Sequence, residues 1–135
     1  MTSSYLDLAP LYGSSDDDQK KVRAFVDGKL KPDCFYEDRV LGFPPGVSVF
    51  LVCFNRFHNY VVGELAAINE GGRFPPPNIK TLEQSMPNAS ATDIQKGFDA
   101  ALAKRDNDLF QTGKLYSTKR TSDVGSPADC ISILS

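Results

Sequence analysis

The stretch VSVFLVCFNRFHNYVVGELAAIN, Val47–Asn69, decides the fold class of this protein. Its large apolar side chains recur three or four residues apart, which indicates a helix with one apolar stripe. This stripe consists of Phe50, Phe54, Phe57, Val61, Leu65 and Ile68. The first two turns, Val49–Phe54, are apolar on every side, so we expect other structure to enclose that end. Pro44–Gly46 precede the helix, and Gly71-Gly72 predict a left-handed cap at its end.

The flanking segments predict shorter helices joined by Pro-rich loops. Ser15 before Asp16–Asp18 is typical of a helix cap and an acidic first turn, in a helix that runs through Phe25. The residues before it, 3–13, are apolar but contain a proline, and we expect a packed loop or a short extended piece. Residues 29–46 and 73–90, rich in proline and glycine, are predicted to be irregular.

The last third of the chain predicts one more helix and then a loss of order. Thr92 with Gln95 has the spacing of a capping box, for a helix that ends at Lys104-Arg105. Asp106–Asp108 should cap a further apolar start, but the pattern fades after Leu115. We therefore expect a partial domain over residues 1–115 and a divergent, disordered tail over 116–135.

Composition excludes several classes of function. The chain has 135 residues, 41% of them hydrophobic and 24% charged, with a net charge of −2 and a pI near 5.3. This balance gives no basic surface for nucleic acid. No apolar run reaches the roughly 20 residues of a transmembrane helix, and the first residues lack the pattern of a secretory signal. We therefore expect a cytoplasmic protein. The three cysteines, Cys34, Cys53 and Cys130, match neither a disulfide framework nor a zinc site.

Candidate chemical groups are scarce. His58 is the only histidine and lies on the predicted long helix, where a hydrogen-bonded structural role is the favoured interpretation. The Asp16–Asp18 cluster is better explained as a first helical turn than as a metal site, because consecutive aspartates cannot all face one ion. Residue pattern alone therefore indicates only a helical piece of a soluble globular protein.

Three ordered motifs resemble the peroxidase–cyclooxygenase superfamily, the animal-type haem peroxidases. They are Tyr5–Gly13, then Pro44–Val47 followed by Phe54–Asn59, and finally Asp108–Thr112. In detail, the stretches Asp27–Phe35, Asn59–Val62 and Glu64–Glu70 are similar to fungal fatty-acid oxygenases of the linoleate diol synthase and psi-producing types. The resemblance covers residues 1–115 and implies a fragment of the helical haem peroxidase fold, with one long helix and shorter ones.

The resemblance implies a haem-dependent dioxygenase of oxylipin biosynthesis that adds O2 to a polyunsaturated fatty acid. The family's distal histidine lies upstream of the first motif, and its radical tyrosine and proximal histidine lie downstream of the last. Both haem-face histidines are therefore expected to be absent from this chain, and no catalytic or haem-binding residue is assigned. Arg56, His58 and Asn59 match the family's Arg-x-His-Asn motif, whose histidine supports a helix and does not ligate iron.

A calcium loop of the superfamily is matched in part by Ser3, Tyr5 and Asp7, with Ala9 in place of the last hydroxyl. One carboxylate with a lost oxygen ligand makes a weak site, so we expect calcium not to be retained.

Two functions of different classes remain from the sequence. The first is an inactive fragment of a fatty-acid oxygenase. The second is a noncatalytic interaction module that associates with a full-length oxygenase, or else the product of a decayed gene. A self-contained small enzyme has no group of residues to support it.

Overall fold

The computed structural model describes residues 8–123, including the side chains of residues 8–119. Its elements are α1 (Ala9–Tyr12), α2 (Asp16–Val22), η1 (Asp38–Gly42), α3 (Pro45–Ile68), η2 (Glu70–Gly72), α4 (Ile79–Ser85) and α5 (Ala91–Asp123). Within residues 8–123 the only β pairing is an isolated antiparallel bridge between Arg23 and Leu30. The expected mainly α fold is confirmed.

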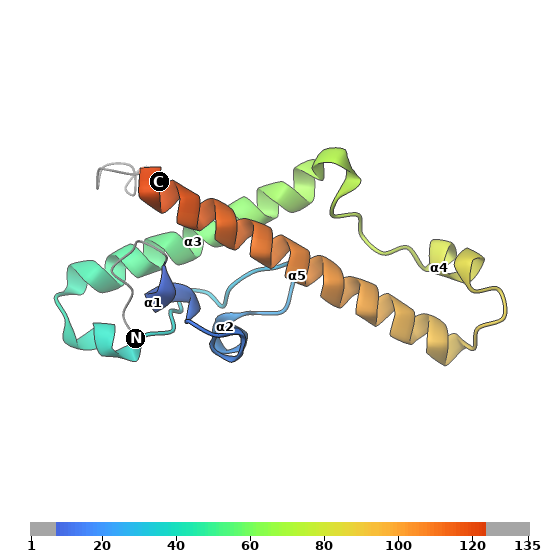
Figure 1. Cartoon of the computed structure of the whole chain (residues 1–135), viewed down its shortest axis with the longest axis horizontal. Coiled ribbons are helices and arrows are strands. Elements are labelled where there is room, and N and C mark those ends of the chain that lie inside the picture. Colours follow the sequence, from blue (N-terminus) through green and yellow to red (C-terminus); the bar gives the residue numbers. More distant parts are fainter. Residues whose placement is uncertain (1–7, 124–135) are drawn as a thin grey trace.

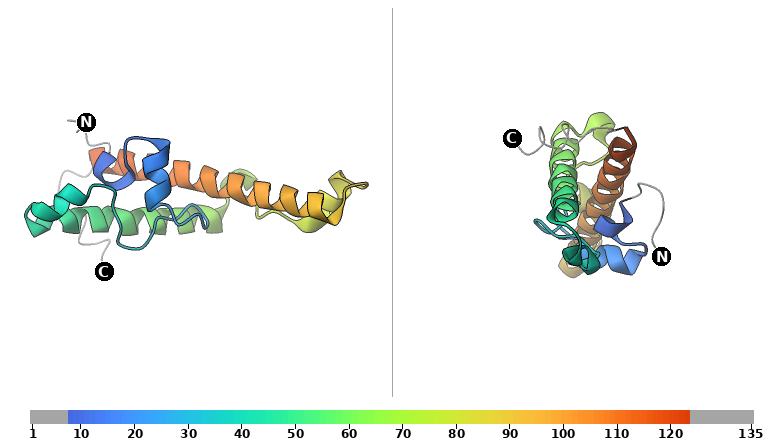
Figure 2. Two further views of the ribbon diagram at one scale, coloured as in Figure 1. Left: turned by 90° about the horizontal axis from the view of Figure 1, so that it is seen from below. Right: turned by 90° about the vertical axis from the view of Figure 1, so that its left-hand side faces the viewer.

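The two long helices, α3 and α5, form the frame of an elongated molecule. They run antiparallel and cross each other in the view of Figure 1. The short helices α1 and α2 lie beside the crossing, while α4 packs against the beginning of α5, at the far end of the molecule (Figures 1 and 2). The N-terminal third of the chain therefore meets both long helices near the middle of the frame.

Helix α3 confirms the prediction from the apolar stripe, and only its cap differs. The helix begins at Pro45, whose missing N–H is no loss in a first turn. It ends at Ile68 because Asn69 adopts the left-handed region, with φ of 43°. The side chain of Asn69 also accepts the Phe74 N–H at 2.7 Å. The left-handed cap is therefore Asn69 and not the Gly71-Gly72 pair.

Helix α5 differs most from expectation. It runs without a break through Lys104-Arg105, and it continues over 116–123, where the sequence predicted a disordered tail. The start also differs, because the helix begins at Ala91 and the Ser90 carbonyl accepts the first bonds. Asp106 does not cap a new helix, because its carboxylate binds groups from the N-terminal third of the chain. Residues 124–135 of the predicted tail lie outside the described residues.

The predicted cap of α2 is confirmed, but α1, η1 and α4 are helical where the sequence predicted loops. Ser15 Oγ accepts the Asp18 N–H at 3.2 Å, although α2 ends at Val22 and not at residue 25. Helix α4 begins after Asn78, whose side chain accepts the Lys80 N–H at 3.1 Å. Asparagine is a strong cap even in a Pro-rich segment, which explains a helix that periodicity could not reveal.

The buried core surrounds the crossing of the long helices and leaves the beginning of α3 uncovered. The main buried apolar cluster is Leu8, Leu11, Tyr12, Val22, Leu30, Val40, Leu51 and Phe110. By contrast, Val49 and Phe50 in the first turns of α3 are 56% and 44% exposed. The described residues therefore do not enclose that end of the helix as its sequence requires.

Candidate functional site

The imidazole of His58 is fully buried at the place where three elements meet. The ring packs against Tyr12 of α1 and Phe110 of α5, with centroid separations of 5.4 Å to each. All three side chains are at most 1% exposed. A Cβ atom on Gly113 would lie 2.4 Å from Val62 Cγ2 and 3.0 Å from His58 Cε1, so glycine permits α5 to approach α3 here.

The partners of His58 fix the position of its proton. Nε2 lies 3.0 Å from the Gly28 carbonyl oxygen, which can only accept, so Nε2 carries the proton. Nδ1 of the neutral ring then accepts from the Tyr12 hydroxyl, at 2.8 Å. The side chain of Ser117, which is fully buried on α5, lies beside Tyr12. Both ring nitrogens of His58 therefore have protein partners.

The turn at Gly28, which accepts from His58, is also hydrogen-bonded to α5. Its N–H donates to Asp106 Oδ1 at 2.6 Å, and Asp106 Oδ2 accepts from Arg23 Nη2 at 2.5 Å. Arg23 also donates to Asn107 Oδ1 at 3.1 Å, and its guanidinium lies 4.4 Å from the centroid of Phe110. The side chains of Arg23 and Asp106 are both 10% exposed, so this is a buried ion pair. We call the connected set of Tyr12, His58, Gly28, Asp106 and Arg23 the buried network.

The other polar residues of the same face of α3 bind the segment 28–34. Asn55 Nδ2 donates to two carbonyl oxygens of this segment, at 3.0 and 2.7 Å. Arg56 makes a two-bonded ion pair with Asp33, at 2.8 and 2.9 Å. The amide of Asn59 bonds both the N–H and the carbonyl of one residue in the segment, at 2.7 and 3.2 Å. The Arg-x-His-Asn motif is therefore a clamp that fixes an irregular segment to a helix.

Burial dominates the titration of the central pair. Burial lowers the pKa of His58 from 6.5 to about 4, and the positive charge of Arg23 acts in the same direction. The bond to the Gly28 carbonyl partly opposes this shift. Burial also raises the pKa of Tyr12 well above its ordinary value of 10, and the neighbouring Ser117 partly opposes this shift. Both groups are neutral at pH 7, which suits hydrogen bonding and not proton exchange.

Acid should destabilise the fold through His58, because the unfolded state takes up its proton first. The pKa of His58 is about 4 in the folded chain and near 6.5 when exposed, so its contribution is complete above pH 7 and declines between pH 6.5 and 4. At pH 5 we expect the free energy of unfolding to be lower by about 2 kcal/mol. Urea unfolding, followed by circular dichroism at pH 7.5 and pH 5, measures the change.

The control is the His58→Gln variant, which should lose this pH dependence because His58 is the only histidine. If that variant does not fold, the NMR resonances of the His58 ring in the native chain give the answer. They should stay constant from pH 7.5 to pH 5. Resonances that titrate near pH 6.5 would contradict the assignment.

The structure does not describe the residues of the other predicted site. Ser3, Tyr5 and Asp7, the partial calcium match, lie outside the described residues. Among residues 8–123, no three His, Cys, Asp or Glu side chains gather as metal ligands would. The sequence did not predict that Tyr12, Arg23 and Asp106 take part in this site. A tyrosine in an apolar run, or an aspartate at an expected helix cap, gives no local indication of a partner that is distant in sequence.

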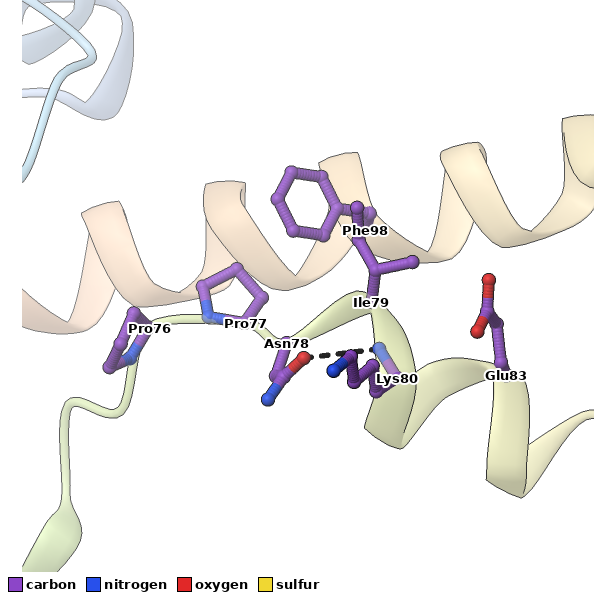
Figure 3. A pocket seen from close by; sticks show the side chains of 7 residues that line it. All are labelled: Pro76, Pro77, Asn78, Ile79, Lys80, Glu83 and Phe98. Carbon is purple, nitrogen blue, oxygen red and sulfur yellow. Dashed lines mark hydrogen bonds between the residues drawn. The ribbon is translucent and has the colours of Figure 1, made fainter.

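A surface depression lies between α4 and α5, away from the buried network (Figure 3). It is lined by Pro76, Pro77, Asn78, Ile79, Lys80, Glu83 and Phe98. Its two charged side chains, Lys80 and Glu83, are both exposed, and Phe98 is only half-buried. The depression is open to solvent and brings together no acid, base or nucleophile with a defined partner, so it offers no catalytic arrangement.

In the part of the chain that the structure describes, no helix has the length and apolar character needed to cross a membrane.

Several fungal proteins are similar in sequence to this chain. Psi-producing oxygenase A of Aspergillus fumigatus is 58% identical over 117 residues, which are 87% of this chain and 9% of that protein. Linoleate diol synthase of Gaeumannomyces graminis is 53% identical over 117 residues, again 87% and 9% of the two chains. A bifunctional dioxygenase–epoxy alcohol synthase of Fusarium oxysporum is 51% identical over 117 residues, 87% of this chain and 8% of that protein.

No family model matches the chain. No solved structure matches it either. Identities above 50% over most of the chain show common ancestry with these fungal oxygenases. The chain is homologous to one segment of the psi-producing oxygenases and linoleate diol synthases, and it spans about 9% of the length of those relatives.

Proposed function

We propose that this chain forms a scaffold segment of a haem-dependent fatty-acid dioxygenase of oxylipin biosynthesis. The observation that carries the proposal is the 58% identity over 117 residues to a protein named a psi-producing oxygenase. The clamp supports the same role, because Arg56, His58 and Asn59 use their polar atoms to hold the 28–34 segment. In this reading the chain shapes a larger enzyme and supplies no reacting group.

His58 does not fit the role of an axial haem ligand. It is the one histidine of the chain, and both of its ring nitrogens are bonded within the fold. Iron coordination by His58 would break a bond to Tyr12 or to Gly28 in a fully buried site. We therefore propose that residues elsewhere in such an enzyme hold the haem, and that this chain alone is inactive.

The test has two arms. In the first, haemin is added to the isolated chain and to its His58→Gln variant, and the Soret band is recorded. We expect the same weak, unsaturable change in both. A saturable one-to-one complex that requires His58 would overturn the proposed inactivity.

The second arm asks whether the chain can serve in an oxygenase. A chimera of Aspergillus fumigatus psi-producing oxygenase A carries this chain in place of the matching 117-residue segment. We expect the chimera to oxygenate linoleate at a rate within about tenfold of the parent enzyme, because conservative differences in a scaffold cost only about one or two kcal/mol. A folded chimera without any oxygenation would contradict the scaffold role.

One observation favours a second candidate, a noncatalytic interaction module that binds a full-length oxygenase. The chain exposes large apolar side chains, among them Leu41 and Phe43 at 70% and 60%. An independent module should be monodisperse in solution despite these side chains. A scaffold segment out of its context should aggregate, and light scattering of the purified chain distinguishes the two.

A further inference from the structure

Residues 41–50 form an exposed apolar region, which we call the apolar tip. It comprises the end of η1 and the first turns of α3, at one end of the molecule (Figures 1 and 2). Its large side chains are Leu41, Phe43, Val47, Val49 and Phe50, with exposed fractions of 70%, 60%, 42%, 56% and 44%. Single exposed apolar residues are ordinary, but five within ten residues are a concentration that is typical of an interface.

The charges around the apolar tip indicate what kind of surface it meets. No charged residue occurs from Val40 to Asn55. The arginines at either side of this run are already paired, Arg39 with Glu37 and Arg56 with Asp33. Along the described chain, the tip is therefore flanked by no unpaired arginine of the kind that would favour binding to an anionic membrane. An apolar protein surface is the better match, because burial there leaves no charge without a partner.

We propose that the apolar tip packs into the remainder of a fatty-acid oxygenase of the psi-producing type. This proposal rests on the proposed scaffold function. The relatives are more than ten times longer than the segment that matches this chain, so they contain ample further structure to cover the tip. The helix itself supports this, because the first turns of α3 are apolar all round and one face alone meets the chain's own core, at Leu51.

The experiment compares the reactivity of one position in two settings. Phe43→Cys is introduced into the full chain and into the chimera with psi-producing oxygenase A, and maleimide labelling is followed peptide by peptide with mass spectrometry. At a dilution where light scattering shows a monomer, we expect fast labelling in the isolated chain, and labelling at least tenfold slower in the chimera. Native Cys53, 3% exposed, is the internal control because it reacts only if α3 loosens.

Each outcome separates the interface from the scaffold function. Equal labelling in both settings, with linoleate oxygenation intact, would overturn the interface and leave the function standing. Slow labelling in a chimera without oxygenation would support the interface and contradict the function. Slow labelling in the isolated chain, together with twice the monomer mass in light scattering, would assign the tip to a second copy of this chain and overturn the proposal.

A pair of substitutions tests the tip without a reactive probe. Phe43→Asp with Phe50→Asp should leave the helicity of the isolated chain unchanged, because both side chains are substantially exposed. The same pair should make the chimera insoluble or abolish its oxygenation. Ile68→Asp is the matched control, since Ile68 is 67% exposed at the opposite end of α3. A chimera that tolerates both tip aspartates would contradict the proposal.

Discussion

Replacing Gly28 with alanine is expected to lower the free energy of unfolding by about 3 kcal/mol or more, enough to unfold a marginally stable chain. Gly28 has φ of +71°, a conformation that costs an alanine about 1–2 kcal/mol. Its Cβ would also lie 2.6 Å from the Phe110 nitrogen and 2.9 Å from the Leu109 carbonyl carbon. Both atoms belong to the backbone of α5, so the clash cannot be relieved by a rotamer change. Urea unfolding followed by circular dichroism measures the loss.

Gly71 provides the matched control for this substitution. It has φ of +64°, but a Cβ there would meet no heavy atom within 4 Å. Gly71→Ala therefore isolates the conformational cost, and we expect a loss of about 1 kcal/mol. The difference between the two losses of unfolding free energy measures how closely the turn at Gly28 packs against α5. Equal losses would contradict the packing of Gly28 against that helix.

The Asp106→Asn variant should lose about 3 kcal/mol of stability, because it leaves the guanidinium of Arg23 buried without a countercharge. Asparagine retains an oxygen that can accept the Gly28 N–H, so the loss reports mainly the charge. The Arg23→Met and Asp106→Asn double variant removes both charges and should recover part of the loss. Thermal and urea unfolding of the four proteins in this cycle give the coupling between the two residues.

An exposed ion pair in the same chain provides the matched comparison for the effect of burial on such a pair. Arg56 and Asp33 are bonded twice, like a strong pair, but their side chains are 54% and 51% exposed. Asp33→Asn is the identical chemical change, and asparagine tolerates the positive φ of that position. We expect a loss of less than about 1 kcal/mol. A larger loss from Asp33→Asn than from Asp106→Asn would show that burial does not set the value of these pairs.

Local signals predicted the parts of the fold that local interactions decide. The spacing of apolar residues located α3 to within two residues, and Ser15 before three aspartates identified the cap of α2. The cap of α3 was predicted at Gly71-Gly72 because Asn69, which caps the helix instead, is a less common left-handed residue than glycine. Helix α4 was missed because seven residues between prolines are too few to show a period.

The buried network could not be predicted, because its partners are distant in sequence. The hydrogen-bonded role favoured for His58 agrees with its two bonds, but nothing local indicates Tyr12 or Gly28 as the partners. Asp106 led to the main error in α5: an aspartate before apolar residues is typical of a cap, yet here it accepts from Arg23 and Gly28. Helix α5 therefore continues through residues 106–108, where its sequence is typical of the start of a new helix.

The path of the buried network has a consequence for cooperativity. It starts on α1 at Tyr12, passes through α3 at His58 and the turn at Gly28, and ends on α5 at Asp106. Detaching any of these segments breaks at least one buried hydrogen bond, so they should open together as one unit. Helix α4 packs against the beginning of α5 and takes no part in this network. That end of the molecule can fray and refold on its own without disturbing the centre.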